Sequence, residues 1–316
     1  MPFAARAQSA KMPAAEIPVI GLLHSGSPEQ NAKRMAAFHR GLAEAGFVEG
    51  RNIVIKYRWA HGDKDKLPEM AADLIDQNVV LITTPGSTPA SLAVKAATDT
   101  IPIVFGVGSN PVANGLVASI ARPGGNATGV TSLNAELVSK RLGLFRDLVP
   151  KTSQYFMLIN PTSNLTAPFS KDLGRAAASL GIKFEVLRAS NNHEIDAAFA
   201  RIASLPNSVV MCSPDSFFYT RRRRIAALAL RGKVPTSFDV RDYVDAGGLM
   251  SYGSDFLYVM ARTGNYVGRI LKGDKAADLP VEQAKKFELI INSKTATALG
   301  IDVPLDMLMT ANAVVE

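Results

Sequence analysis

Three short loops rich in glycine and hydroxyl side chains are expected to follow strands in the first third of the chain. The first begins at Ser25, the second contains Gly86 and Ser87, and the third contains Ser109 and Asn110. Each loop opens an expected helix, whose first N–H groups are free and whose dipole is positive at that end, so the loops could hold a carboxylate without a formal cation. Taken singly, each loop is better explained as a helix N-cap. The three together favour an anion-binding receptor.

The second half of the chain places different polar groups after its expected strands. Asp215 and Asp239 could face a ligand ammonium, and Phe217 or Phe238 could cover an apolar or aromatic group. The alternatives are that Asp215 only caps the following helix and that the phenylalanines belong to the core. With Asn160, which also follows a strand, the predicted ligand-binding residues are Ser25, Gly86, Ser87, Ser109, Asn110, Asn160, Asp215, Phe217, Phe238 and Asp239.

The sequence lacks the motifs that would indicate an enzyme. No G-x-x-x-x-G-K-[ST] or G-x-G-x-x-G phosphate loop and no G-x-S-x-G nucleophile motif is present. The four histidines have no metal-ligand spacing, and the single cysteine, Cys212, ends an apolar strand run and excludes an intrachain disulfide. We therefore expect no catalytic residues, no metal and no cofactor.

These candidate residues lie on a strand–helix pattern that runs through the chain twice. Short apolar runs that indicate strands alternate with amphipathic helices, and the alternation restarts in the second half. The runs are Ile17–Leu23, Ile53–Tyr57, Val79–Thr83 and Ile101–Val107, then Tyr155–Asn160, Ile182–Leu187, Ser208–Cys212 and Val234–Phe238. The pattern predicts an α/β protein with two Rossmann-like lobes, each with a parallel sheet, joined by a hinge. Such a pair encloses a cleft for a small molecule.

The predicted domain boundaries follow from where the chain can cross between lobes. Residues 17–130 and 252–277 are assigned to the first lobe, and residues 131–251 and 278–316 to the second. Residues 1–16 are rich in small side chains and unpatterned, and they resemble the end of an export signal.

The positive net charge raises nucleic acid or an anionic surface as a partner, and the hydropathy bears on a membrane span. The formal net charge is +7, but the basic residues are mostly scattered and the one dense run is Arg221–Arg224 in an expected helix. A solvated helix face is the favoured interpretation of this run, with a docking face for an acidic partner as the alternative. We expect no nucleic-acid partner. No apolar run approaches the roughly 20 residues that span a bilayer.

Several stretches carry a family resemblance that extends, in order, over nearly the whole chain from Ile17. They are 101–105 (IPIVF), 110–112 (NPV), 121–130 (ARPGGNATGV), 247–253 (GGLMSYG), 279–283 (LPVEQ) and 287–292 (FELIIN). Together they resemble the ABC-transporter substrate-binding proteins of the tryptophan/tyrosine-binding type.

The resemblance implies a type I periplasmic-binding-protein fold with three crossovers between lobes. It implies a monomeric periplasmic protein that delivers its ligand to an ABC permease in the inner membrane. It also places Ser25, Gly86-Ser87, Ser109-Asn110, Asn160, Asp215 and Asp239 at the family's ligand loops. Many relatives carry an aromatic or aliphatic residue where this chain has Phe238-Asp239, which indicates a more polar or cationic group on the ligand.

We expect, then, a solute-binding protein that captures a small amino-acid-like or aromatic carboxylate ligand by hinge closure. The alternative is a ligand-sensing domain that signals to a membrane kinase or chemoreceptor. A DNA-binding repressor is disfavoured because no helix-turn-helix precedes Ile17.

Overall fold

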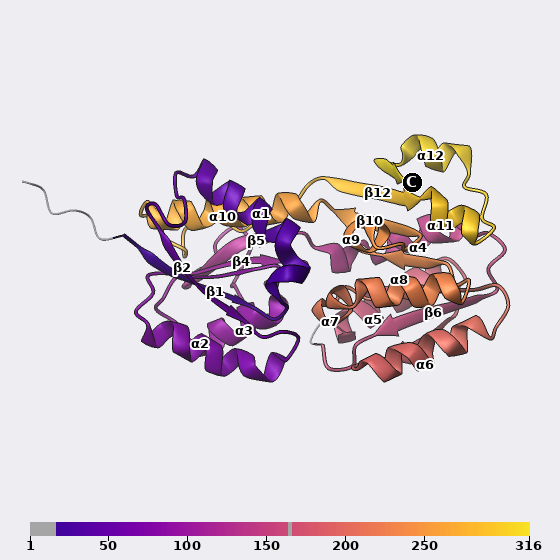
Figure 1. The fold of residues 1–316 in the computed structure, drawn as a ribbon, viewed down its shortest axis with the longest axis horizontal. Coiled ribbons are helices and arrows are strands. Elements are labelled where there is room, and N and C mark those ends of the chain that lie inside the picture. The colour runs from indigo at the N-terminus through magenta and orange to yellow at the C-terminus, as the bar shows by residue number, and fades with distance from the viewer. Residues whose placement is uncertain (1–16, 164–165) are drawn as a thin grey trace, which may run out of the picture.

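The chain is built on two β-sheets, each flanked by helices, that lie side by side (Figure 1). The computed structural model describes residues 17–163 and 166–316, so the predicted export-signal remnant at 1–16 lies outside the described residues. We call the six-stranded sheet with its helices the first lobe and the seven-stranded sheet with its helices the second lobe. The predicted fold class, two Rossmann-like lobes, is confirmed.

The first lobe has parallel strands in the order β11-β5-β4-β3-β1-β2. The inner strands β1, β3, β4 and β5 are almost wholly buried because helices cover both faces of the sheet, whereas the edge strands β2 and β11 are partly exposed. The strands are β1 (Val19–His24), β2 (Val54–Trp59), β3 (Ile82–Pro85), β4 (Ile103–Val107), β5 (Ala127–Thr131) and β11 (Glu282–Gln283). The helices are α1 (Pro28–Glu44), α2 (Leu67–Asp76) after the short helix η1 (Lys64–Lys66), α3 (Thr88–Ala97) and α10 (Phe256–Leu271).

The second lobe has strands in the order β13-β12-β10-β9-β8-β6-β7, and only the β10–β12 pairing is antiparallel. The strands are β6 (Gln154–Ile159), β7 (Phe184–Arg188), β8 (Ser208–Cys212), β9 (Thr236–Phe238), β10 (Met250–Ser254), β12 (Phe287–Asn292) and β13 (Ala313–Val315). The helices are α4 (Val138–Leu148) after η2 (Asn134–Leu137), α5 (Thr166–Ser179), α6 (Asn192–Ala203), α7 (Ser216–Thr220), α8 (Arg222–Arg231), α9 (Asp242–Asp245), α11 (Ser293–Ala298) and α12 (Leu305–Thr310).

The chain passes between the sheets three times, after β5, after β10 and after β11. The first crossing follows Thr131, the last residue of β5. The predicted boundary at residue 251 falls inside β10, and the one at residue 277 precedes β11, which pairs with β5 in the first sheet through Glu282↔Val130. Strand β11 is too short to show a periodic pattern. In β10, Gly253 allows close packing and does not mark the crossing, since a Cβ there would lie 1.8 Å from the carbonyl oxygen of Asp239.

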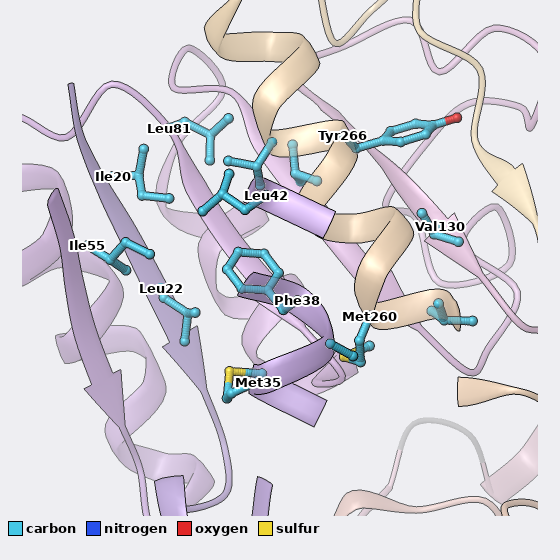
Figure 2. Close-up of a cluster of buried hydrophobic side chains, with 14 of the residues drawn as sticks. Ile20, Leu22, Met35, Phe38, Leu42, Ile55, Leu81, Val130, Met260 and Tyr266 are labelled. Atoms are coloured by element: carbon cyan, nitrogen blue, oxygen red, sulfur yellow. The ribbon is translucent and has the colours of Figure 1, made fainter. Parts of the chain in front are cut away.

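Helix α10 returns to the first lobe and packs beside α1 over one face of the sheet. Phe38 and Leu42 of α1 meet Met260 and Tyr266 of α10 above the strand residue Leu22, in a single buried cluster (Figure 2). Asp255 caps α10 by accepting hydrogen bonds from the N–H groups of Leu257 and Tyr258, as N-cap carboxylates do. Over the two described ranges, no helix is both long and apolar enough to cross a membrane.

The α1–α10 contact depends on two glycines. A Cβ added at Gly41 would lie 1.7 Å from the carbonyl oxygen of Ala261, and one at Gly264 would lie 2.1 Å from that of Phe38. Because both obstacles are main-chain atoms, no side-chain rotation can relieve them. The two helices therefore approach more closely than any larger residue would permit.

We predict that Gly264→Ala lowers the free energy of unfolding by about 1–3 kcal/mol, because α1 and α10 must separate to admit the methyl group. Gly174→Ala is the matched control, because Gly174 is an exposed helical glycine with open space around its Cα. That control should gain roughly 0.5–1 kcal/mol from better helix propensity. Urea unfolding followed by circular dichroism measures both, and equal stability of the two variants would contradict the close-contact interpretation.

Candidate ligand-binding cleft

The carboxyl ends of the strands in both sheets line one cleft between the lobes. It consists of an outer chamber of about 320 Å³ and a smaller inner chamber of about 60 Å³. Thr88 of the first lobe and Asp215, Ser216 and Thr220 of the second line both chambers, so the two chambers adjoin. This is where open parallel sheets place ligands.

The outer chamber has one apolar side and one polar side. Leu92 and Pro89 of the first lobe and Phe217 of the second provide apolar surface. Asn160 lines the same space and is held in place, since its Oδ1 accepts hydrogen bonds from the main chain and hydroxyl of Thr162. The chamber thus suits a molecule with an apolar body and some polar groups.

Four of the residues predicted from sequence line the outer chamber: Ser25, Asn160, Asp215 and Phe217. Asp215 also caps α7, because its Oδ1 accepts from the N–H groups of Phe217 (2.8 Å) and Phe218 (3.3 Å). Asp215 thus caps the helix and also lines both chambers. Burial raises the pKa of Asp215, although hydrogen bonds from Asn160 and the cap oppose that shift.

Gly86 lines the inner chamber, but its loop neighbours serve the fold. Ser87 is fully buried, caps α3 through the N–H of Ala90, and donates to the Ser25 hydroxyl at 2.9 Å. Ser109 accepts from the Asn114 side chain at 2.7 Å, and Asn110 caps the turn that follows it. Ser87, Ser109 and Asn110 line neither chamber; they hold the loops in shape.

Phe238, the last residue of β9, and Asp239, which follows it, were both predicted to bind the ligand, and the structure gives them different surroundings. Phe238 is fully buried and stacks on Tyr243 with ring centroids 4.2 Å apart, so it lies in the core and not in either chamber. Asp239, the next residue, lines the inner chamber. Burial raises the pKa of Asp239, while the nearby Arg141 and Arg34 guanidinium groups act in the opposite direction.

His24, the last residue of β1, lines the inner chamber and was not among the predicted residues. It is 2% exposed, its ring lies 4.9 Å from that of Trp59, and its Nδ1 accepts a hydrogen bond from the N–H of Gly26 at 2.8 Å. Burial, helped by the positive charge of Arg34, lowers the pKa of His24 to about 3. The imidazole is therefore neutral at physiological pH.

Arg34 of α1 is the second residue that sequence reasoning missed, and it reaches across the cleft. Its Nη2 donates to Asp242 of the second lobe at 3.2 Å, and its guanidinium lies 3.5 Å from the ring centroid of Tyr219 and 4.4 Å from that of Phe256. Burial alone would raise the pKa of Asp242, but the charge and hydrogen bond of Arg34 hold it below its ordinary value. Helical periodicity marks Arg34 only as a polar position, and no local signal reveals that it is 5% exposed.

Further contacts join the lobes around this pair. Lys64 donates to the carbonyl oxygen of Thr162 at 3.0 Å, and Arg222 donates to that of Gln30 at 2.9 Å. Neither a solvated helix face nor a docking face for an acidic partner describes all of the Arg221–Arg224 run. Arg222 makes this hydrogen bond to α1, and the Arg221 guanidinium lies 3.7 Å from the ring centroid of Phe217. The structure accordingly has its two lobes in contact across the cleft.

The described side chains offer recognition groups rather than reactive ones. Within the described ranges, no three His, Cys, Asp or Glu residues are grouped so that they could hold a metal ion. Burial raises the pKa of the Cys212 thiol to about 12, so it is not a ready nucleophile. The arrangement can bind and enclose a small polar molecule.

A two-lobed α/β protein with a ligand-sized cleft at the strand ends belongs structurally to the class of solute-binding proteins. The family model for the ABC transporter substrate binding protein matches residues 23–315, and the chain belongs to that family. This confirms the family resemblance noted in the sequence.

Several relatives are similar over most of their length. A tyrosine-binding protein of Clostridioides difficile (strain R20291) is 27% identical over 271 residues, covering 85% of this chain and 77% of the relative. A conserved domain protein from Vibrio cholerae has a TM-score of 0.88 at 26% identity, covering 95% of this chain and all of the other.

Two further solved structures differ in ligand state. An ABC domain from Streptococcus pneumonia in complex with L-Trp has a TM-score of 0.87 at 24% identity, covering 94% of this chain and 99% of the other. A ligand-free, open substrate-binding protein with adhesive properties from Clostridium difficile, also 24% identical, has a TM-score of 0.68 and covers 95% of this chain and 99% of its own.

We predict that the buried neutral His24 makes the protein less stable in mild acid. The unfolded chain takes up a proton near pH 6.5 and the folded chain only near pH 3, so stability falls as the pH falls between these values. The loss amounts to about 2 kcal/mol near pH 5. Urea unfolding at about pH 7 and about pH 5 should show His24→Gln losing less stability than the wild type, and an identical loss in both proteins would contradict a neutral His24.

Proposed function

We propose that this protein is the extracytoplasmic solute-binding component of an ABC importer. It captures a small amino-acid-like or aromatic carboxylate ligand between its lobes by hinge closure. The observation that carries the proposal is the pair of adjoining chambers, walled by residues that follow the strands of both sheets and bridged by the Arg34–Asp242 pair.

The ligand class is supported by the two chambers and by the relatives. The outer chamber supplies apolar surface for an aromatic or aliphatic body, and the inner chamber supplies charged groups for a polar head. The carboxylates of Asp215 and Asp239, which line the inner chamber, support recognition of an ammonium group. The named relatives bind tyrosine or hold L-Trp, which favours the same class here.

Closure is supported by how the lobes are connected and by their present contact. Three connections join the lobes, and ion pairs and hydrogen bonds cross the cleft between them. At the same sequence identity the chain is closer in shape to the L-Trp complex than to the open, ligand-free protein, with TM-scores of 0.87 and 0.68. A ligand shifts this equilibrium only if it binds the closed form more tightly than the open one.

The proposed partner is an ABC permease in the inner membrane, the compartment is the periplasm, and the protein works as a monomer without cofactor or nucleic acid. A ligand-sensing domain that feeds a membrane kinase or chemoreceptor would use the same cleft. The neighbouring genes separate these functions, since permease and ATPase genes favour import and a kinase gene favours sensing.

We predict that thermal unfolding in the presence of L-amino acids or aromatic carboxylates will reveal a stabilising ligand. A ligand that binds only the folded state stabilises it by about 2.7 kcal/mol at roughly a hundredfold excess over its dissociation constant. Short peptides, sugars and nucleosides serve as comparison compounds. A melting temperature unchanged by every compound would count against a solute receptor for this class.

We further predict that Asp242→Asn weakens ligand binding about tenfold, although Asp242 lines neither chamber. Loss of the charge pair with Arg34 makes the closed form rarer, and the apparent affinity falls by the same factor. Isothermal titration calorimetry with the stabilising compound measures the change. Asp196→Asn is the control, because Asp196 pairs with Arg224 inside the second lobe, and equal affinities of the two variants would show that closure does not use the Arg34–Asp242 pair.

A further inference from the structure

Two buried N–H groups on the first-lobe side of the inner chamber have no hydrogen-bond acceptor. Among the described residues, neither Nε2 of His24 nor Nε of Arg34 has a partner. Both side chains line this chamber and are at least nine-tenths buried. An unsatisfied buried donor is costly, so two at one small chamber require an explanation.

The protonation of His24 is fixed by its neighbour. The N–H of Gly26 donates to Nδ1 of His24, so Nδ1 carries no proton. In the neutral ring the proton must then lie on Nε2, which makes that atom a donor and not an acceptor. The Nε2–H group is therefore free to donate a hydrogen bond to an acceptor in the chamber.

Arg34 is fixed by other contacts that leave its Nε–H group free. Its Nη2 donates to Asp242, and the guanidinium lies over the rings of Tyr219 and Phe256. These contacts hold the side chain without using Nε. The charge and orientation of the donor are thus set before any ligand arrives.

Glycines keep the space in front of these donors open. Gly86 adopts φ +81°, and a Cβ there would lie 3.5 Å from Nε2 of His24. Gly108 lines the same chamber. A larger side chain at either position would occupy the small volume that an acceptor needs.

The opposite wall belongs to the second lobe and carries the acids. Asp215 and Asp239 line it, so the chamber presents donors from one lobe and carboxylates from the other. In an α-amino acid the carboxylate and the ammonium are bonded to the same carbon. Such a ligand would accept hydrogen bonds from the first-lobe donors and donate to the second-lobe carboxylates. A carboxylate is the acceptor that best matches two charge-assisted or polarised N–H donors.

We propose that the inner chamber binds the ligand's carboxylate through Nε2–H of His24 and Nε–H of Arg34, with the ligand body directed into the outer chamber. This inference rests on the proposed function, because it names the group that the solute receptor recognises. It assigns recognition of the acid to two first-lobe side chains instead of to the hydroxyl loops around Ser87 and Ser109. Ligands substituted at the carboxylate are excluded.

The test compares each acid with its amide by isothermal titration calorimetry, using L-tryptophan with L-tryptophanamide and L-tyrosine with L-tyrosinamide. The wild type should bind the acids at least about tenfold more tightly than the amides. His24→Leu and Arg34→Lys should bring the acid-to-amide ratio close to one, since each removes one N–H donor and Arg34→Lys keeps the charge for Asp242. His24→Gln, which retains an N–H donor, should restore part of the ratio.

Arg222→Gln is the matched control. It removes a cross-lobe arginine contact outside both chambers, so acid and amide should weaken together and their ratio should stay unchanged. Because the wild-type ratio needs no variant, a folding failure in any one variant leaves the test intact.

Four outcomes would overturn the inference. Equal binding of acid and amide by the wild type, or an unchanged ratio in His24→Leu, refutes the carboxylate subsite while the receptor function stands. Binding of only sugars or nucleosides does the same. If none of the screened compounds binds, the proposed function fails and the inference fails with it.

Discussion

The ion pair between Arg34 and Asp242 joins the two halves of the molecule at the wall of the inner chamber. Arg34 lies on α1, whose next two turns carry Phe38 and Leu42 into the core shared with α10. The glycine contacts between α1 and α10 set the position of α1 in the first lobe, and therefore the position of the Arg34 guanidinium in the cleft. A cation that would be expensive to bury alone is stabilised by a carboxylate and two aromatic faces.

The strand directions explain why such different loops meet. Parallel strands bring His24, Gly86 and Gly108 to one edge of the first sheet, and Asn160, Asp215 and Asp239 to one edge of the second. Because these two edges face each other, hydroxyls, amides, carboxylates and apolar side chains from distant parts of the chain share one space. The loop residues that do not face this space, such as Ser87 and Ser109, are used to cap helices and brace turns.

The fold was predictable from sequence because buried parallel strands and amphipathic helices leave strong periodic signals. The site was predictable only in part. Rules about strand ends find Asp215 and Asp239, but they cannot distinguish Phe238, which stacks in the core, from Phe217, which faces the cleft. Arg34 lies within a helix, and its burial depends on residues some 200 positions away, so no local pattern reveals it. The two residues of β11 carry no periodicity, so the sequence predicts the third crossing before this strand and not after it.

The place of Trp59 beside His24 has a practical consequence. Trp59 is the only tryptophan in the chain, and its ring lies 4.9 Å from an imidazole that lines the inner chamber. Indole emission responds to the polarity and quenching groups within contact distance, so the protein contains its own fluorophore next to a residue that lines its cleft. For ligands that lack an indole, occupancy of the chamber can be followed optically without a label.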